Sequence, residues 1–230
     1  MLITCWSVKG GSGVSVVAAA LAGLMSERHG GAVVADLGGD QPAVLGLAEP
    51  AGPGIRDWCD TDAPDEAMER IAVEVVDGLL LVPRGEGAAH LGASRAAQLR
   101  AALGALAPVV VVDAGVPLTT TAAHIAARPE SPPDQLPHGE HLRDAGSSLF
   151  VTRACYLSLR RAMRIGVDAD GVVLVTEPGR TLGRRDVADL LGLPVVGVVE
   201  DDPAIARAVD AGTLARRLPG SLARGLRRAG

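Results

Sequence analysis

A glycine-rich segment close to the start of the chain constrains the fold more than any other feature of the sequence. It lies between a short apolar run, Leu2–Val8, and an alanine- and leucine-rich stretch, Ser15–Arg28. The first is too short for a helix and predicts a strand, whereas the apolar periodicity of the second predicts a helix. Glycines let the backbone turn so that successive N–H groups point at one anion, and the helix N-terminus adds partial positive charge. We therefore expect a phosphate-binding loop. Its residues are Lys9, Gly10, Gly11, Ser12, Gly13, Val14, Ser15 and Val16.

Strands and helices alternate along most of the 230 residues. The clearest strand is Pro108–Asp113, which holds four consecutive valines. The other expected strands are Ala32–Asp36, Leu79–Val82, Ser148–Thr152, Gly171–Val175 and Val195–Val199. The further expected helices are Pro64–Val75, Ala88–Leu106, Cys155–Ile165, Arg184–Leu191, Pro203–Ala211 and Ser221–Arg228. This alternation predicts an α/β fold with a doubly wound, mostly parallel sheet flanked by helices.

The length fits one domain that spans residues 1–230. Residues 119–146 hold four prolines without sustained periodicity, and we interpret them as a proline-rich loop or insertion. Residues 213–230 form a basic C-terminal segment with no acidic residue. Its leucines predict a short helix packed on the domain with its arginines in water, in preference to a peripheral membrane contact.

Composition excludes several classes of function. The net charge of −5 gives no strong signal for nucleic acid. Three widely spaced cysteines indicate free thiols in a reducing compartment. No signal peptide is visible, and no apolar run approaches the ~18 residues that a membrane span needs. We therefore expect a cytoplasmic protein.

The segment Lys9–Ser15 resembles the deviant Walker A loop of the ParA/MinD ATPases, whose pattern is Lys-Gly-Gly-x-Gly-Lys-Thr/Ser. Other segments are similar to the CpaE/TadZ branch of that family: Ala35–Leu37, Val44–Leu47, Val109–Gly115, Thr152–Leu157 with Leu159–Ala162, Leu191–Pro194 and Glu200–Pro203. The resemblance implies binding of ATP or ADP with Mg²⁺, with Ser15 and Asp113 at the metal. It also implies a polar or septal location and protein partners from the pilus-secretion or cell-division machinery.

The resemblance further implies a homodimer, because the first lysine of the family's loop reaches the phosphates of the partner subunit. Lys9 is the only lysine among 22 basic residues; all the others are arginines. Lysine presents a compact charge with three rotatable donors, which arginine does not. Its retention at this position favours a phosphate-binding role for Lys9.

Three departures from the family pattern distinguish this chain, and the first two predict slow or absent hydrolysis. Val14 replaces the second lysine, which holds the β- and γ-phosphates and stabilises the charge that moves during transfer. Gly38 stands where the family commonly has a water-orienting carboxylate, which leaves Asp36 as the candidate catalytic acid, with Asp40 two residues out of register. The chain has no asparagine to read adenine, and Thr176, which could make one hydrogen bond, stands at that place, so the choice between adenine and guanine stays open.

The loop also allows a second interpretation from another class. Gly11-x-Gly13-x-x-Val16, with Asp36 at the end of the next strand, mimics a dinucleotide-binding fingerprint. That fingerprint requires Gly or Ala where this chain has Val16, because the helix packs closely on the strand there. An NAD-type oxidoreductase is the alternative, together with a scaffold that binds no nucleotide.

One pair of histidines has the spacing of metal ligands. His138 and His141 lie in the proline-rich stretch beside Glu140 and Asp144. They have no cysteine partners and no predicted helix to fix their spacing. We interpret them as part of a solvated loop.

Overall fold

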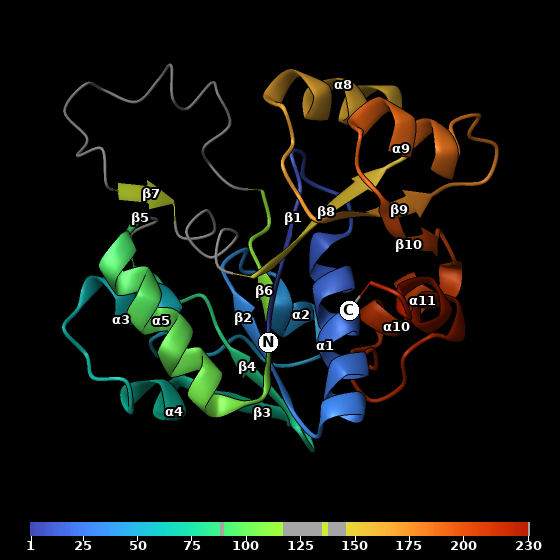
Figure 1. Ribbon diagram of the computed structural model, residues 1–230. Helices are drawn as coiled ribbons and strands as arrows, with labels where there is room; N and C mark the ends of the chain where they lie inside the picture. Colours follow the sequence, from blue (N-terminus) through green and yellow to red (C-terminus); the bar gives the residue numbers. More distant parts are fainter. Residues whose placement is uncertain (88–89, 117–134, 138–145, 230) are drawn as a thin grey trace.

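The computed structural model describes residues 1–87, 90–116, 135–137 and 146–229, and its centre is an eight-stranded sheet (Figure 1). The strands are β1 (Leu2–Trp6), β2 (Ala32–Asp36), β3 (Val73–Val76), β4 (Leu79–Val82), β6 (Val109–Asp113), β8 (Ser147–Arg153), β9 (Gly171–Thr176) and β10 (Val195–Glu200). Their order is β10-β9-β8-β1-β6-β2-β4-β3, and all neighbours are parallel except β3 and β4. The mostly parallel α/β fold is thus confirmed. Two further strands, β5 (His90–Gly92) and β7 (Gln135–Pro137), form a separate antiparallel pair.

Helices cover both faces of the sheet. On one face lie α1 (Val14–His29), α2 (Gln41–Val44), α10 (Pro203–Asp210) and α11 (Gly220–Leu226). On the other face, α3 (Ile55–Asp60), α4 (Ala67–Ile71) and α5 (Ala93–Leu106) cover one half, and α8 (Tyr156–Ile165) and α9 (Arg184–Leu191) cover the other. This arrangement is doubly wound, as the sequence predicts.

The valine-rich strand shows why the sequence reads as continuous apolar runs. Val109 and Val111 of β6 pack into the cluster around α1, and Val110 and Val112 into the cluster around α5. None of the four exposes more than 3% of its surface. A strand buried on both faces has no polar side, so its sequence shows no alternation.

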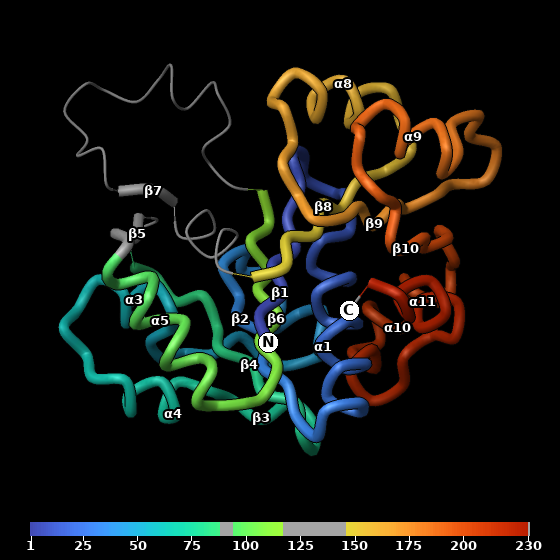
Figure 2. Tube along the Cα trace, in the orientation of Figure 1, coloured from blue at the N-terminus to red at the C-terminus, as the bar shows by residue number. Residues whose placement is uncertain are grey.

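The position of β1 determines where a ligand can enter. Figure 2 shows the N-terminal half of the chain winding to one side of β1 and the C-terminal half to the other. In such sheets ligands bind outside the carboxyl ends of the strands, where the direction of winding reverses. The glycine loop follows the carboxyl end of β1 directly, so the fold places it at this point.

The expected helix over Pro64–Val75 is wrong in its second half. The structure has a short α4, Ala67–Ile71, followed by the edge strand β3, Val73–Val76, antiparallel to β4. Asp77-Gly78 joins the two strands, with Gly78 at φ 76°. Such a turn with β-branched valines before it is typical of a hairpin, and it outweighs local helix propensity. The helix expected over Ala88–Leu106 begins only at Ala93.

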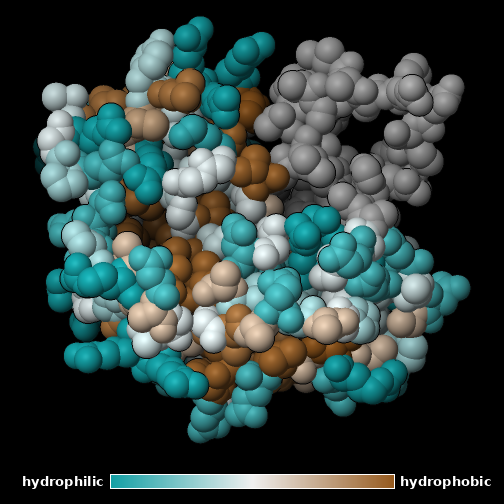
Figure 3. All heavy atoms as spheres, turned by 180° about the vertical axis from the view of Figure 1, so that it is seen from behind, coloured by the Kyte–Doolittle hydropathy of each residue, from teal (hydrophilic) through white to brown (hydrophobic). Residues whose placement is uncertain are grey.

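The C-terminal helix packs on the domain, as the sequence predicts. Leu222 and Leu226 of α11 are fully buried beside α1, while Arg224, Arg227 and Arg228 are exposed. In the described part of the chain, no helix is long and apolar enough to cross a membrane. The face opposite that of Figure 1 mixes polar and apolar residues, and the apolar ones gather in separate areas (Figure 3).

Candidate functional site: a phosphate-binding loop at the end of β1

Two glycines shape the loop between β1 and α1. Gly11 has φ 74° and Gly13 has φ 92°, both in the left-handed region that other residues rarely adopt. Gly13 is the N-cap of α1, and a Cβ there would meet Val175 only at 3.7 Å. Backbone conformation, rather than lack of space, therefore requires glycine at this position. The turn leads directly into the N-terminus of the 16-residue helix α1, which carries partial positive charge.

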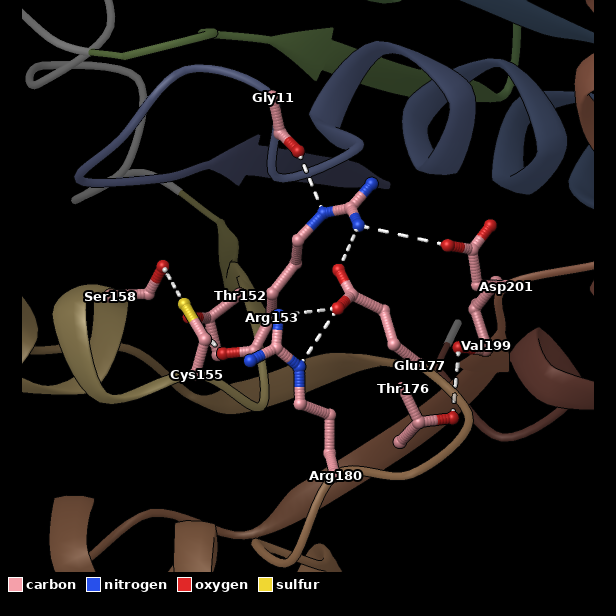
Figure 4. Close-up of polar contacts among 10 residues, drawn as sticks. All are labelled: Gly11, Thr152, Arg153, Cys155, Ser158, Thr176, Glu177, Arg180, Val199 and Asp201. Atoms are coloured by element: carbon pink, nitrogen blue, oxygen red, sulfur yellow. Dashed lines mark hydrogen bonds and ion pairs between the residues drawn. The ribbon is translucent and has the colours of Figure 1, made fainter.

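Side chains hold the loop from within and from outside. The Ser12 hydroxyl donates to the Lys9 carbonyl at 2.8 Å. Arg153, at the end of β8, donates from Nε to the Gly11 carbonyl at 2.8 Å (Figure 4). Its Nη1 donates to Glu177 and lies 3.8 Å from the Asp201 carboxylate. Arg153 therefore ties the loop to the carboxyl ends of β8, β9 and β10.

Asp113 lies at the carboxyl end of β6, beside the start of α1. It is fully buried and accepts hydrogen bonds from the Gly115 N–H at 3.0 Å and from Gln41 Nε2 at 2.7 Å. Burial raises the pKa of this carboxyl, while these hydrogen bonds act in the opposite direction. The Ser15 side chain is among the groups that lower this pKa, so the expected pair of Ser15 and Asp113 lies close together.

Asp36 lies next to Asp113, because the two residues are register partners in β2 and β6. Its carboxylate accepts from the Gly39 N–H at 2.6 Å and from the Gln41 N–H at 3.1 Å. Burial raises the pKa of Asp36 to about 6; the Gly39 hydrogen bond lowers it, and the charge of Asp113 raises it. Through these two hydrogen bonds, Asp36 fixes the backbone of the loop between β2 and α2.

Gln41 connects these parts, and the sequence interpretation missed it. It is fully buried, and its Nε2 donates both to Asp113 and, at 2.9 Å, to the Ser15 carbonyl. One side chain therefore links the loop after β2 to β6 and to the first turn of α1. The sequence signal that could have indicated this role is that Gln41 is a polar residue shortly after an acid-ended strand and immediately before a proline.

A cavity of about 740 Å³ opens above the loop, a volume typical of small-molecule sites. All eight residues of the expected loop line it. The cavity is also lined by Gly38, Asp40, Arg56 and Arg84. Asp40 thus reaches the site despite its shifted register. The two arginines were not anticipated, since nothing in their local sequence marks them.

Thr176 does not line this cavity. It ends β9, and its hydroxyl donates to the Val199 carbonyl at 3.4 Å. Next to it, Glu177 accepts from Arg153 and, at 2.6 Å, from Arg180 (Figure 4). The surface next to Thr176 therefore carries the ion pairs of Glu177 with Arg153 and Arg180.

Within the described ranges, no group of three or more acidic, histidine or cysteine residues is placed to hold a metal ion. His138 and His141 lie outside the described residues. Ser15 and Asp40 line the cavity with oxygen atoms suited to a hard cation, and the buried Asp113 lies close to Ser15.

Solved structures with the same mostly parallel, helix-flanked sheet include ATPases of the ParA and MinD type. The chain is similar to a ParA-family ATPase from Chlorobium tepidum, with a TM-score of 0.70 and 16% identity over 98% of this chain and 96% of that one. It is similar to the septum site-determining protein MinD from Pyrococcus horikoshii, solved with Mg-ADP, with a TM-score of 0.67 and 18% identity over 97% and 91%.

A third similar structure is the MinC:MinD cell division complex of Aquifex aeolicus, with a TM-score of 0.70 and 17% identity over 99% of this chain and 95% of that one. The sequence matches no family model and no curated protein. At these identities the likeness establishes the fold alone.

The pKa of Asp36 generates a pH prediction. Because its folded pKa of about 6 exceeds the ordinary value near 4, the native state holds the proton more tightly than the unfolded state. Wild-type stability should therefore fall as pH rises from 4 to 7, by roughly 2–3 kcal/mol from this group. The Asp36→Asn variant should lack this part of the loss. Urea unfolding of both proteins without Mg²⁺ measures it, and identical pH profiles would contradict the assignment.

Proposed function

We propose that this chain is a nucleotide-binding switch or scaffold of the ParA/MinD type, close to the CpaE/TadZ branch, with weak or absent ATP hydrolysis. The observation that carries the proposal is a complete anion-binding loop in which an aliphatic side chain, Val14, occupies the place of a lysine. The loop, the helix N-terminus and the cavity supply what phosphates need. The ammonium that stabilises phosphoryl transfer is missing.

The bound species is ATP or ADP with Mg²⁺. The Ser15 hydroxyl and the Asp113 carboxylate offer the hard oxygen atoms that Mg²⁺ prefers, and the two side chains lie close together. Ser15 would bind the ion directly, and Asp113 would orient its water shell. When bound, the ion would neutralise part of the phosphate charge. It would also offset the energetic cost of burying the charged Asp113 carboxylate. The solved MinD from Pyrococcus horikoshii holds Mg-ADP, and a McdA from Cyanothece holds ATP.

Slow hydrolysis follows from the two residues of the cavity, Val14 and Gly38, that replace groups needed for phosphoryl transfer. Val14 is aliphatic and therefore supplies no charge. It exposes only 7% of its surface and packs into the cluster around α1. Gly38 has no side chain, although a Cβ there would lie 3.5 Å from the Asp113 carboxylate. Loss of a single transition-state donor costs about 2.7–4 kcal/mol. Two such losses leave binding as the main activity of the site.

The cellular role is to position other machinery, as a nucleotide-bridged homodimer with Lys9 near the interface. Lys9 lines the cavity, and among the described residues no carboxylate lies within ion-pair distance of it. Its ammonium is therefore available to a second copy. The partners are pilus-secretion or cell-division proteins at a pole or septum, in line with the CpaE/TadZ resemblance.

Binding and turnover are expected to separate. Calorimetry should detect Mg-ATP binding to the wild type, while phosphate release stays near background. Ser15→Ala should weaken Mg²⁺-dependent binding by about tenfold, since one metal ligand is lost. Turnover at or above ~1 s⁻¹, the usual enzyme range, would contradict a degenerate switch. Failure to bind any nucleotide would leave a nucleotide-free scaffold.

Self-association is expected to depend on Lys9. Sedimentation of the wild type should show a dimer that forms with ATP. Lys9→Arg should weaken it, because the guanidinium keeps the charge but not the compact donor geometry, and Lys9→Ala should weaken it further. A monomer under every condition would rule out the trans role. Equal dimerisation of all three proteins would show that Lys9 does not govern the interface.

A further inference from the structure

Two arginines from outside the phosphate-binding loop line the same cavity as the loop. Arg56 is the second residue of α3, and Arg84 follows β4. Both are half-buried and both line the cavity together with Lys9–Val16. The sequence interpretation assigned them no role, and the site as described so far does not use them.

Each guanidinium is fixed against the loop that follows β2. Arg56 Nη2 donates to the Leu37 carbonyl at 3.1 Å, and Arg84 Nη1 to the Gly38 carbonyl at 3.3 Å. A Cβ on Gly39 would lie 2.8 Å from Arg84 Nη1, so this guanidinium lies directly against the backbone there. A Cβ on Gly38 would lie 3.5 Å from the Asp113 carboxylate, so the backbone that holds Arg84 also borders the expected metal position.

The backbone that carries the arginines is itself locked. The Ile55 N–H donates to the Pro83 carbonyl at 2.8 Å, and the Arg56 N–H donates to the Arg84 carbonyl at 2.9 Å. The Asp57 carboxylate accepts from the Gly54 N–H at 2.8 Å and from the Glu86 N–H at 3.2 Å. The two arginines are thus presented by a pair of cross-linked segments, and little ordering is needed when an anion binds.

Their charges are not neutralised by close protein partners. Within the part of the chain that the structure describes, no carboxylate lies within ion-pair distance of either guanidinium. Arg56 Nε is buried and finds no acceptor there. Burial lowers the pKa of Arg56, and the neighbouring charge of Arg84 lowers it too, whereas Asp36, Asp60 and Glu86 act the other way. Two adjacent positive charges with free donors favour an anion between them.

We infer that Arg56 and Arg84 bind the terminal phosphate of a nucleoside triphosphate held by the loop, and so replace the charge that Val14 does not supply. The inference rests on the proposed nucleotide binding and names the residues that distinguish a triphosphate from a diphosphate. Guanidinium groups suit this task because their planar fork matches phosphate oxygens. The loop and Ser15 hold the inner phosphates in either nucleotide, whereas the arginines contact only the third.

The test compares the affinities of Mg-ATP and Mg-ADP by calorimetry for wild type, Arg56→Gln and Arg84→Gln. Each variant should lose about tenfold or more in ATP affinity, as removal of a charge-assisted hydrogen bond predicts, and less than about twofold in ADP affinity. Arg84→Lys should be intermediate, because charge remains and the fork is lost. The matched control is Arg70→Gln, on the exposed surface of α4, which should match the wild type for both nucleotides.

Each failure has its own signature. If wild type binds ADP but the variants bind ATP as tightly as it does, the inference is wrong and nucleotide binding stands. If the variants lose ADP and ATP equally, the arginines support the loop after β2 and do not read the third phosphate. If wild type binds neither nucleotide, both proposals fall. Tripolyphosphate and pyrophosphate, used as probes without a base, should repeat the ATP and ADP pattern even in variants of lowered thermal stability.

Discussion

The site depends on the register of three parallel strands at the centre of the sheet. Asp113 of β6 pairs with Asp36 of β2 on one side and with Cys5 of β1 on the other. Two carboxylates therefore end at the same level, directly beside the loop that leaves β1. A slip of one residue in either pairing would turn the side chains to opposite faces of the sheet and separate the acids. Burial of the valines on both faces is what holds this register.

This register places two buried carboxylates close together. Hydrogen bonds from the surrounding polar groups offset part of the cost of burying them. Gln41 donates its backbone N–H to Asp36 and its side-chain amide to Asp113. Burial raises the pKa of both acids, and the hydrogen bonds from Gln41 lower it. Lys9, Arg56 and Arg84 all line the cavity and bring positive charge to it. A cation beside the acids and a polyphosphate in the cavity would satisfy both sets of groups.

The sequence predicted what is encoded locally. The loop follows from its glycines, and the central strands follow from their valine runs and from the acids that end them. Where a tertiary pairing decided the outcome, the sequence interpretation failed: Val73–Val76 forms an edge strand because β4 offers a partner across the Asp77-Gly78 turn. Gln41, Arg56 and Arg84 were missed for a related reason. Their roles depend on segments that meet only in the folded chain, so no spacing in the sequence marks them.

The central claim is that the loop after β1 binds the phosphates of a nucleotide, and backbone amide NMR tests it most directly. Titration of the protein with Mg-ADP should shift the amide signals of residues 10–15 first and most strongly, because those N–H groups meet the phosphates. NAD at the same concentrations should shift them much less. Unchanged loop signals at millimolar Mg-ADP, or an equal response to NAD, would contradict the account.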